Sequence, residues 1–253
     1  MRRKMQIRLI LLMGMAWGGL FGCQTAQLPH EQNETAIPSE DRLLQGFAQL
    51  STSSISDAID QITGKRGYMS HEIRHVFTTK ICGRAVTVLA RPSSQNEPPK
   101  IALELIDTEP PGKVLVIVME GPDGANVAAF GGIMGTGAQM RGFAGAVLDG
   151  GCRDVSQLQA MKFPVFSRGI VPSNSVGRYI NVARNESVLC GGIPVRANDI
   201  VVGDMDGVVV IPQEREEEIL RLAQELEKKE AETIESVKKL KSIQNASQKH
   251  NRI

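Results

Sequence analysis

The chain has 253 residues, of which 42% are hydrophobic and 23% are charged, and its formal net charge is +1. This length suits one medium domain or two small ones, and the hydrophobic fraction allows a sizeable core. A net charge near zero lacks the basic footprint of nucleic-acid-binding proteins, so we expect no nucleic-acid partner.

The N-terminus has the pattern of an export signal. A basic head, MRRKMQIR, precedes an apolar run at 9–20 that is shorter than the roughly 20 residues of a membrane-spanning helix. The run ends in LFGCQ, which resembles the lipobox of bacterial lipoproteins. That resemblance implies cleavage after residue 22, lipidation of Cys23, and a protein anchored to a membrane on its periplasmic side. An ordinary cleavable signal or a short buried helix is the alternative.

The remaining chain divides into a tether, one domain and a tail. Residues 23–40 are polar, contain two prolines and show no hydrophobic period, which predicts a flexible tether. We expect the folded domain to cover residues 41–241. Residues 242–253 are polar, and we expect them to form a frayed tail.

Helices and strands alternate along the predicted domain. Apolar spacing predicts helices at 41–50 and 51–64, the second with Ser54 and Asp57 as a capping box and Gly64 as its stop. β-Branched or continuous apolar runs predict strands at 82–92, 113–121, 144–150 and 163–169, with short helices within 98–112 and at 155–162. Two Val/Ile runs at 199–212 flank a turn and predict a hairpin, and a long helix begins at Gln213. The class is therefore α/β with a mixed sheet.

A glycine-rich stretch, FGGIMGTGAQMRGFAGAVLDGGCRD at 130–154, is the candidate site. Glycines let backbone approach a ligand closely, and the N–H groups at a helix start can bind a carboxylate or phosphate. Arg153 can neutralise an oxyanion, and Asp154 suits a hard divalent cation. The alternatives are glycines that only permit tight packing, and an Arg153–Asp154 pair that is a surface ion pair or a helix cap.

Other chemistry-bearing residues indicate no further site. Asp204 and Asp206 are interpreted as turn formers, and the four histidines form no evident triad or HExxH motif. After Cys23, the cysteines Cys82, Cys152 and Cys190 show no CxxC spacing, so no zinc site is expected. We interpret them as small buried residues, although one disulfide is possible.

Residues 41–240 resemble the family that contains 4-hydroxy-4-methyl-2-oxoglutarate aldolase and the regulator of ribonuclease E activity A. The resemblance rests on the stretch 130–154, then FPVFSRG, then GGIPVRANDIVVGDMDGVVVIP and a Glu/Lys-rich C-terminal helix, in that order. It implies an RraA-like α/β/β/α sandwich of the swivelling-domain type. It also implies a homotrimer or hexamer with active sites at subunit boundaries.

The resemblance also implies site roles. Gly131, Gly132, Ile133 and Met134 would bind the carboxylate of a small 2-oxo acid, Arg153 would stabilise an enolate, and Asp154 would hold Mg²⁺, with Mn²⁺ or Co²⁺ as alternatives. The implied reaction is retro-aldol cleavage of 4-hydroxy-4-methyl-2-oxoglutarate-like acids to pyruvate, or decarboxylation of oxaloacetate.

One position departs from the family pattern. Many members carry Asp or Glu where this chain has Gly132, and that acid helps manage a proton through water. Asp57 matches an acidic position in the early helix and is the candidate base from a neighbouring subunit. A non-catalytic protein that binds keto acids is therefore the second hypothesis. Ribonuclease inhibition is disfavoured by the export signal, and no nucleoside-binding pattern supports a methyltransferase.

Overall fold

A computed structural model describes residues 39–250 of the chain. The expected signal, the tether and the lipidation residue Cys23 lie outside these residues. The first described element, α1, begins at Ser39, two residues before the expected start of the domain at 41.

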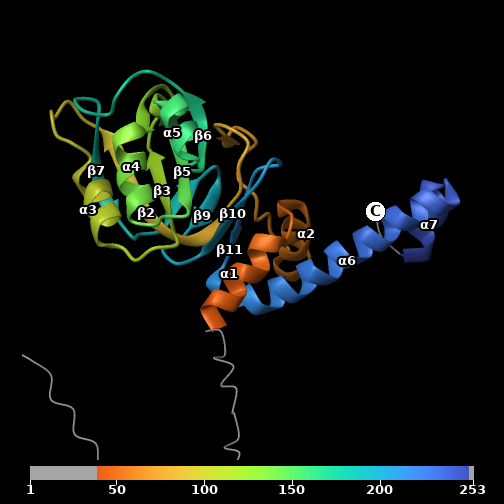
Figure 1. Ribbon diagram of the computed structural model, residues 1–253. Helices are drawn as coiled ribbons and strands as arrows, with labels where there is room; N and C mark the ends of the chain where they lie inside the picture. Colours follow the sequence, from red (N-terminus) through yellow and green to blue (C-terminus); the bar gives the residue numbers. More distant parts are fainter. Residues whose placement is uncertain (1–38, 251–253) are drawn as a thin grey trace, which may run out of the picture. The chain divides into compact units, whose positions relative to one another are not determined.

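A nine-stranded mixed sheet forms the centre of the fold (Figure 1). Its main path has the order β1-β6-β5-β3-β2-β10-β11, while β4 pairs with β5 and β7 with β2. The pairs β2–β3, β3–β5, β4–β5 and β5–β6 are parallel and the others are antiparallel. The strands are β1 (Arg74–His75), β2 (Ile81–Pro92), β3 (Lys113–Met119), β4 (Ala128–Phe130), β5 (Gly145–Cys152), β6 (Val165–Ile170), β7 (Tyr179–Arg184), β10 (Ile200–Gly203) and β11 (Val208–Ile211).

Residues of alternating orientation leave both faces of the sheet apolar, and helices in two groups pack on one of these faces. The first group packs over β2, β3 and β5 and consists of α3 (Lys100–Thr108), α4 (Gly132–Met140) and α5 (Val155–Met161). The second packs on the β10–β11 hairpin and consists of α1 (Ser39–Gln49), α2 (Thr52–Thr63) and α6 (Glu216–Leu240). A small hairpin of β8 (Val188–Cys190) and β9 (Ile193–Val195) packs on the opposite face of the parallel strands.

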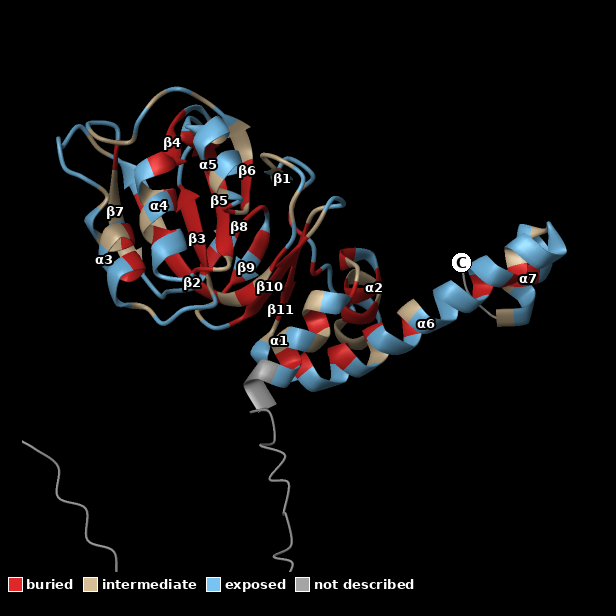
Figure 2. Cartoon of the chain, viewed as in Figure 1, coloured by how far each residue is buried: buried red, intermediate tan, exposed pale blue. Residues whose placement is uncertain are grey.

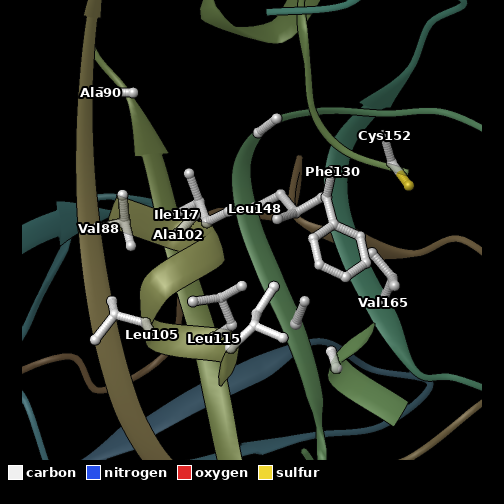
Figure 3. Packing of buried hydrophobic residues seen from close by; sticks show 14 of the residues in the cluster. Val88, Ala90, Ala102, Leu105, Leu115, Ile117, Phe130, Leu148, Cys152 and Val165 are labelled. Carbon is white, nitrogen blue, oxygen red and sulfur yellow. The ribbon is translucent and has the colours of Figure 1, made fainter. Parts of the chain in front are cut away.

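The predicted strands and the predicted hairpin at 199–212 are confirmed, and the mixed α/β class with them. Figure 2 shows β3 and β5 buried along nearly all of their length, as their continuous apolar runs indicate. Figure 3 shows Phe130 and Cys152 among the buried residues of the apolar core. In the sequence, Phe130 directly precedes the glycines and Cys152 directly precedes Arg153. The strands β1, β4, β7, β8 and β9 were not predicted, since each is short or lacks a clear alternation.

The predicted capping box of α2 is wrong. The N-cap is Ser51, whose hydroxyl accepts from the N–H of Ser54, while Ser54 itself lies buried in the first turn. Asp204 was interpreted only as a turn former, but its carboxylate accepts both the N–H and the hydroxyl of Thr52, at 2.8 and 2.6 Å. Asp204 therefore joins the β10–β11 turn to the start of α2.

The C-terminus differs from the expected frayed tail. Residues Ile243–His250 form the helix α7, which packs against the second half of α6. Ala246 is fully buried in that contact, and the His250 ring lies 2.7 Å from the Ser236 hydroxyl. Within residues 39–250, no helix combines the length and the apolar character that crossing a membrane requires.

The three described cysteines are free thiols; Cys152 and Cys190 are buried, as interpreted, whereas Cys82 is half-buried. Burial raises the pKa of Cys82 and of Cys152 to about 12, and it raises that of Cys190 further. The nearby Asp154 carboxylate adds to the rise at Cys152. None of these thiols is therefore a ready nucleophile at neutral pH.

Candidate functional site

A cleft of about 190 Å³ lies at the start of α4. It is lined by the residues expected to bind the substrate carboxylate, Gly131 to Met134, together with Arg153 and Asp154. Its other walls come from α3 and from the loop between β6 and β7. The cleft opens beyond the carboxyl ends of β4, β5 and β6, which is where ligands bind in open α/β sheets.

Strand pairing brings the two halves of the site together. Phe130 at the end of β4 is in register with Cys152 at the end of β5, and the Arg153 N–H donates to the Phe130 carbonyl at 3.1 Å. The chain then turns into α4 after one strand and into α5 after the other. The glycine turn and the Arg153–Asp154 pair, 22 residues apart, therefore face one another.

Asp154 fits both alternatives considered for it: it pairs with Arg153 and it caps a helix, although that helix is α4 and not α5. It has the left-handed backbone conformation, with φ of 57°, which Asp tolerates better than most residues. Although it precedes α5, its side chain caps nothing there; Oδ2 accepts the Gly132 N–H at 2.9 Å. The Arg153 Nε lies 3.6 Å from the same oxygen, and the two side chains remain 38% and 44% exposed. The pair is thus held together while both groups stay open to the cleft.

A glycine is required at position 131 because neighbouring side chains approach its backbone closely, and not because of its backbone angles. Its φ of −162° is extended and open to any residue. A Cβ at this position, however, would lie 2.7 Å from the Asp154 Oδ2 and 2.8 Å from the Arg153 Cγ. The missing side chain therefore lets the Arg153 and Asp154 side chains approach the backbone at the start of α4.

The first turn of α4 keeps two N–H groups available. The Gly132 N–H bonds Asp154 and the Gly135 N–H bonds the Gly131 carbonyl. Among the described residues, no acceptor pairs with the N–H of Ile133 or of Met134. Since the first N–H groups of a helix have no intrahelical partner, these two are free to bind an anion in the cleft. Gly135, further along α4, serves packing, because a Cβ there would collide with the Leu158 side chain.

The possible metal ligands in the cleft would fit a hard cation that keeps most of its bound water. No group of three or more His, Cys, Asp or Glu side chains suited to a metal occurs within the described part of the chain. Among the described residues that line the cleft, Asp154 carries the only carboxylate. Magnesium is commonly held by one or two carboxylates with waters and substrate oxygens, so Asp154 would fit as the single protein ligand of such an ion, and the lining would not form a closed protein cage.

Gly132, the departure from the family pattern, touches Gln157 of α5. A Cβ at Gly132 would collide with the Gln157 carboxamide, whose Cδ would lie 2.6 Å away. The space that a side chain at 132 would need is therefore occupied by an uncharged amide.

This contact predicts coupling between the two positions. Gly132→Ala should destabilise the wild-type chain but cost less in the Gln157→Ala background, where the obstructing amide is gone. We expect a coupling free energy of about 0.5 kcal/mol or more, measured by urea unfolding of both single variants and the double variant. An equal cost of Gly132→Ala in both backgrounds would contradict the contact.

Asp57 is not brought to this cleft within one chain. It lies on α2, where it lines a separate groove with Glu230, Ile234 and Val237 of α6. Its suggested role as a base for a neighbouring subunit stays a prediction.

Several lining residues were missed in the sequence. Asn174, Ser175 and Val176 belong to the β6–β7 loop, and Pro99 and Leu103 to the start of α3. The loop is tied down by Ser173, whose hydroxyl accepts the Ala128 N–H at 3.3 Å and donates to the Asn126 carbonyl at 2.8 Å. The polar run PSNS directly after a parallel strand was the signal that could have revealed the loop.

Known proteins are similar to this chain in both sequence and architecture. The profile of the family "RraA-like: Aldolase/RraA" matches residues 52–210. A protein of Halalkalibacterium halodurans named "Putative 4-hydroxy-4-methyl-2-oxoglutarate aldolase" is 36% identical over 181 residues, which cover 70% of this chain and 80% of that protein.

Two solved structures are similar throughout the domain. An uncharacterised protein from Pseudomonas syringae pv. tomato superposes with a TM-score of 0.72 at 28% identity, covering 81% of this chain and 96% of that one. Streptomyces coelicolor RraAS2, titled an unusual member of the RNase ES inhibitor RraA protein family, gives a TM-score of 0.65 at 25% identity, covering 75% and 94%. With the matched residues spanning most of the described domain, the chain belongs to the RraA-like, Aldolase/RraA family.

Proposed function

We propose that this protein is a divalent-metal-dependent carbon–carbon lyase that acts on small 2-oxo acids. It cleaves 4-hydroxy-2-oxo acids of the 4-hydroxy-4-methyl-2-oxoglutarate type to release pyruvate, and the same site decarboxylates oxaloacetate. The observation that carries the proposal is the shared cleft of free α4 amides, Arg153 and Asp154. The name of the Halalkalibacterium halodurans relative supports a lyase.

Each charged part of the substrate and the metal ion has its own binding group in the cleft. The Ile133 and Met134 N–H groups, at the positive end of α4, bind the substrate carboxylate. Arg153 donates to the 2-oxo oxygen and stabilises the negative charge that gathers there as the adjacent C–C bond breaks. A magnesium-type ion held by Asp154 would polarise that carbonyl as a Lewis acid. Cleavage of 4-hydroxy-4-methyl-2-oxoglutarate balances as two molecules of pyruvate.

An assay of pyruvate release tests the proposal. We expect purified protein to release pyruvate from 4-hydroxy-4-methyl-2-oxoglutarate and from oxaloacetate with magnesium, and to lose that activity when EDTA is added. Restoring excess magnesium or manganese should restore it. Absence of turnover on both compounds under all of these conditions would reject the lyase.

A non-catalytic keto-acid-binding protein is the second candidate, and Gly132 favours it. Asp154 supplies the only carboxylate among the described lining residues, and the space that a side chain at position 132 would take holds the neutral Gln157 amide. Proton transfer then depends on water or on a neighbouring subunit, for which Asp57 in a homotrimer or hexamer is our candidate. Pyruvate binding measured by calorimetry without any turnover would select this second function.

A lipid anchor at the N-terminus is also part of the proposal. We propose that Cys23 is lipidated and holds the domain on the periplasmic side of a membrane, on the strength of the LFGCQ motif alone. Mass spectrometry of the N-terminal peptide from the producing bacterium tests this, because an unmodified Cys23 would reject the anchor.

A further inference from the structure

The last two helices carry their charges unevenly. Residues 216–235 of α6 hold eight glutamates and three cations, Arg221, Lys228 and Lys229. Residues 236–250, which complete α6 and form α7, hold four lysines and neither aspartate nor glutamate. Figure 1 shows this second part at the end of α6 that points away from the sheet, with α7 packed back on α6. Positive charge is therefore concentrated at the far end of a helical arm.

Large apolar side chains are exposed at the same end. Leu240 is the last residue of α6 and Ile243 the first of α7, and they are 50% and 62% exposed. Three lysines flank them within residues 238–244, a segment that we call the tip. Lysines in the last turn of a helix stabilise its unpaired carbonyls. That effect does not explain why two hydrocarbon side chains beside these lysines remain in water.

Most of the charge of the tip is available to an outside partner. Lys238 pairs with Glu235 at 2.7 Å, and both of these side chains are largely exposed. Such an exposed pair contributes little free energy and exchanges readily for another anion. Lys239 and Lys241 are exposed and form no ion pair within the described part of the chain. The tip therefore presents cations around an apolar centre.

From this arrangement we infer that the tip docks on a bilayer that contains anionic lipids. Leu240 and Ile243 enter the headgroup region, while the lysines meet the lipid phosphates. Apolar side chains set among lysines are typical of helices that bind at a membrane interface. The long apolar stem of lysine lets its charge stay at the phosphates while the neighbouring side chains insert. A nucleic acid would use the same lysines but would leave Leu240 and Ile243 without an apolar partner.

The proposed lipid anchor would hold the tip close to such a surface. The chain between Cys23 and Ser39 extends to about 55 Å at most. The helix α1, which begins at Ser39, packs on α6, the same helix that ends in the tip. Weak docking is then sufficient, because a tether raises the effective concentration of the tip at the membrane. The inference goes beyond the proposed lyase and rests on the proposed anchor only for this tethering.

A fluorescent probe on the tip tests the inference. Gln244 is exposed, so Gln244→Cys in the full chain accepts the environment-sensitive dye NBD. Cys23→Ser in the same chain removes the lipidation residue, and the dye then reacts with one fully exposed thiol. Because the apolar run at 9–20 would attach the chain to vesicles by itself, the readout is the emission of the probe and not vesicle binding. We expect a blue shift with vesicles containing phosphatidylglycerol, little shift with pure phosphatidylcholine, and loss of the shift at high salt.

Charge reversal identifies the contribution of the lysines. Lys239→Glu combined with Lys241→Glu should lower the ratio of membrane-bound to free probe about tenfold or more, since each lysine near an anionic surface contributes to binding. Lys228→Glu combined with Lys229→Glu is the matched control. It makes the same change of charge at exposed positions of the same helix, outside the tip, and should leave the shift in place. Equal effects of the two pairs would overturn the assignment to the tip.

The remaining outcomes separate the other partners. Leu240→Ser combined with Ile243→Ser should also abolish the blue shift although every lysine remains, and an unchanged shift would overturn the insertion. A probe that stays in water with both kinds of vesicle would overturn the docking, whether or not Cys23 is lipidated in the bacterium. A shift without vesicles that grows with protein concentration would assign the tip to a second copy of the chain. A shift with duplex DNA alone would assign it to nucleic acid, and either result would overturn the inference.

Discussion

Arg153→Ala is expected to lower the rate of pyruvate release by about 10²–10³-fold, the usual cost of removing one oxyanion donor. Arg153 carries the only positive charge among the described residues that line the cleft, so no other side chain of this lining can replace it. The loss should fall on kcat more than on KM, since the negative charge on the 2-oxo oxygen grows as the bond breaks. Steady-state kinetics with oxaloacetate measures both parameters.

Arg153→Lys is the control for charge alone. Lysine keeps the positive charge but lacks the rigid fork of donors, so we expect it to recover only part of the rate. Because the Arg153 side chain is 38% exposed, neither variant should unfold the domain, which circular dichroism can verify. A folded Arg153→Ala variant with undiminished turnover would remove the arginine from the proposed chemistry.

Asp154→Asn is expected to remove the metal dependence of the site. Asparagine accepts the left-handed backbone of this position and can keep the hydrogen bond from the Gly132 N–H, so the start of α4 should remain intact. What it loses is the negative charge. Since outer-shell partners alone are worth about 10–100-fold in metal affinity, loss of this carboxylate should weaken Mn²⁺ binding by about 100-fold or more.

Metal titration of the protein without substrate gives a readout that is independent of turnover. Asp154→Ala is the harsher companion variant, because it loses the charge and the cap and also places alanine at a φ of 57°. We therefore expect Asp154→Ala to be less stable than Asp154→Asn, with both equally poor in metal binding. Wild-type Mn²⁺ affinity in Asp154→Asn would show that the ion, if bound, is held by other groups.

Regular elements with strong local patterns were predictable. The strand at 113–121 is a continuous apolar run, and the observed β3 covers Lys113–Met119. The hairpin at 199–212 follows from two Val/Ile runs around a turn, and β10 and β11 pair as expected. Gly64 ends α2 in the left-handed conformation that its position indicated. In each case the signal lies within about ten residues of the element.

Features that depend on distant partners were not predictable. Ser51 proved to be the cap of α2 instead of Ser54, because Glu227 of α6 and Asp204 of the hairpin turn complete the hydrogen bonding there. The order and pairing of β4 and β7 likewise come from chain folding over long separations, since β7 pairs with β2. Short strands carry too few residues for a period of two to stand out.

By itself, the sequence predicted the α/β class and identified Gly131–Met134 and the Arg153–Asp154 pair as candidate site residues, since these signals lie in short local stretches of the chain. Only the tertiary structure decided that Asp154 caps α4 and not its own helix, that Gln157 fills the space beside Gly132, and that Leu103 and Val176 complete the wall. The physical reason is that these contacts join segments far apart in the chain. Strand register sets their distances, and no local pattern of residues encodes it.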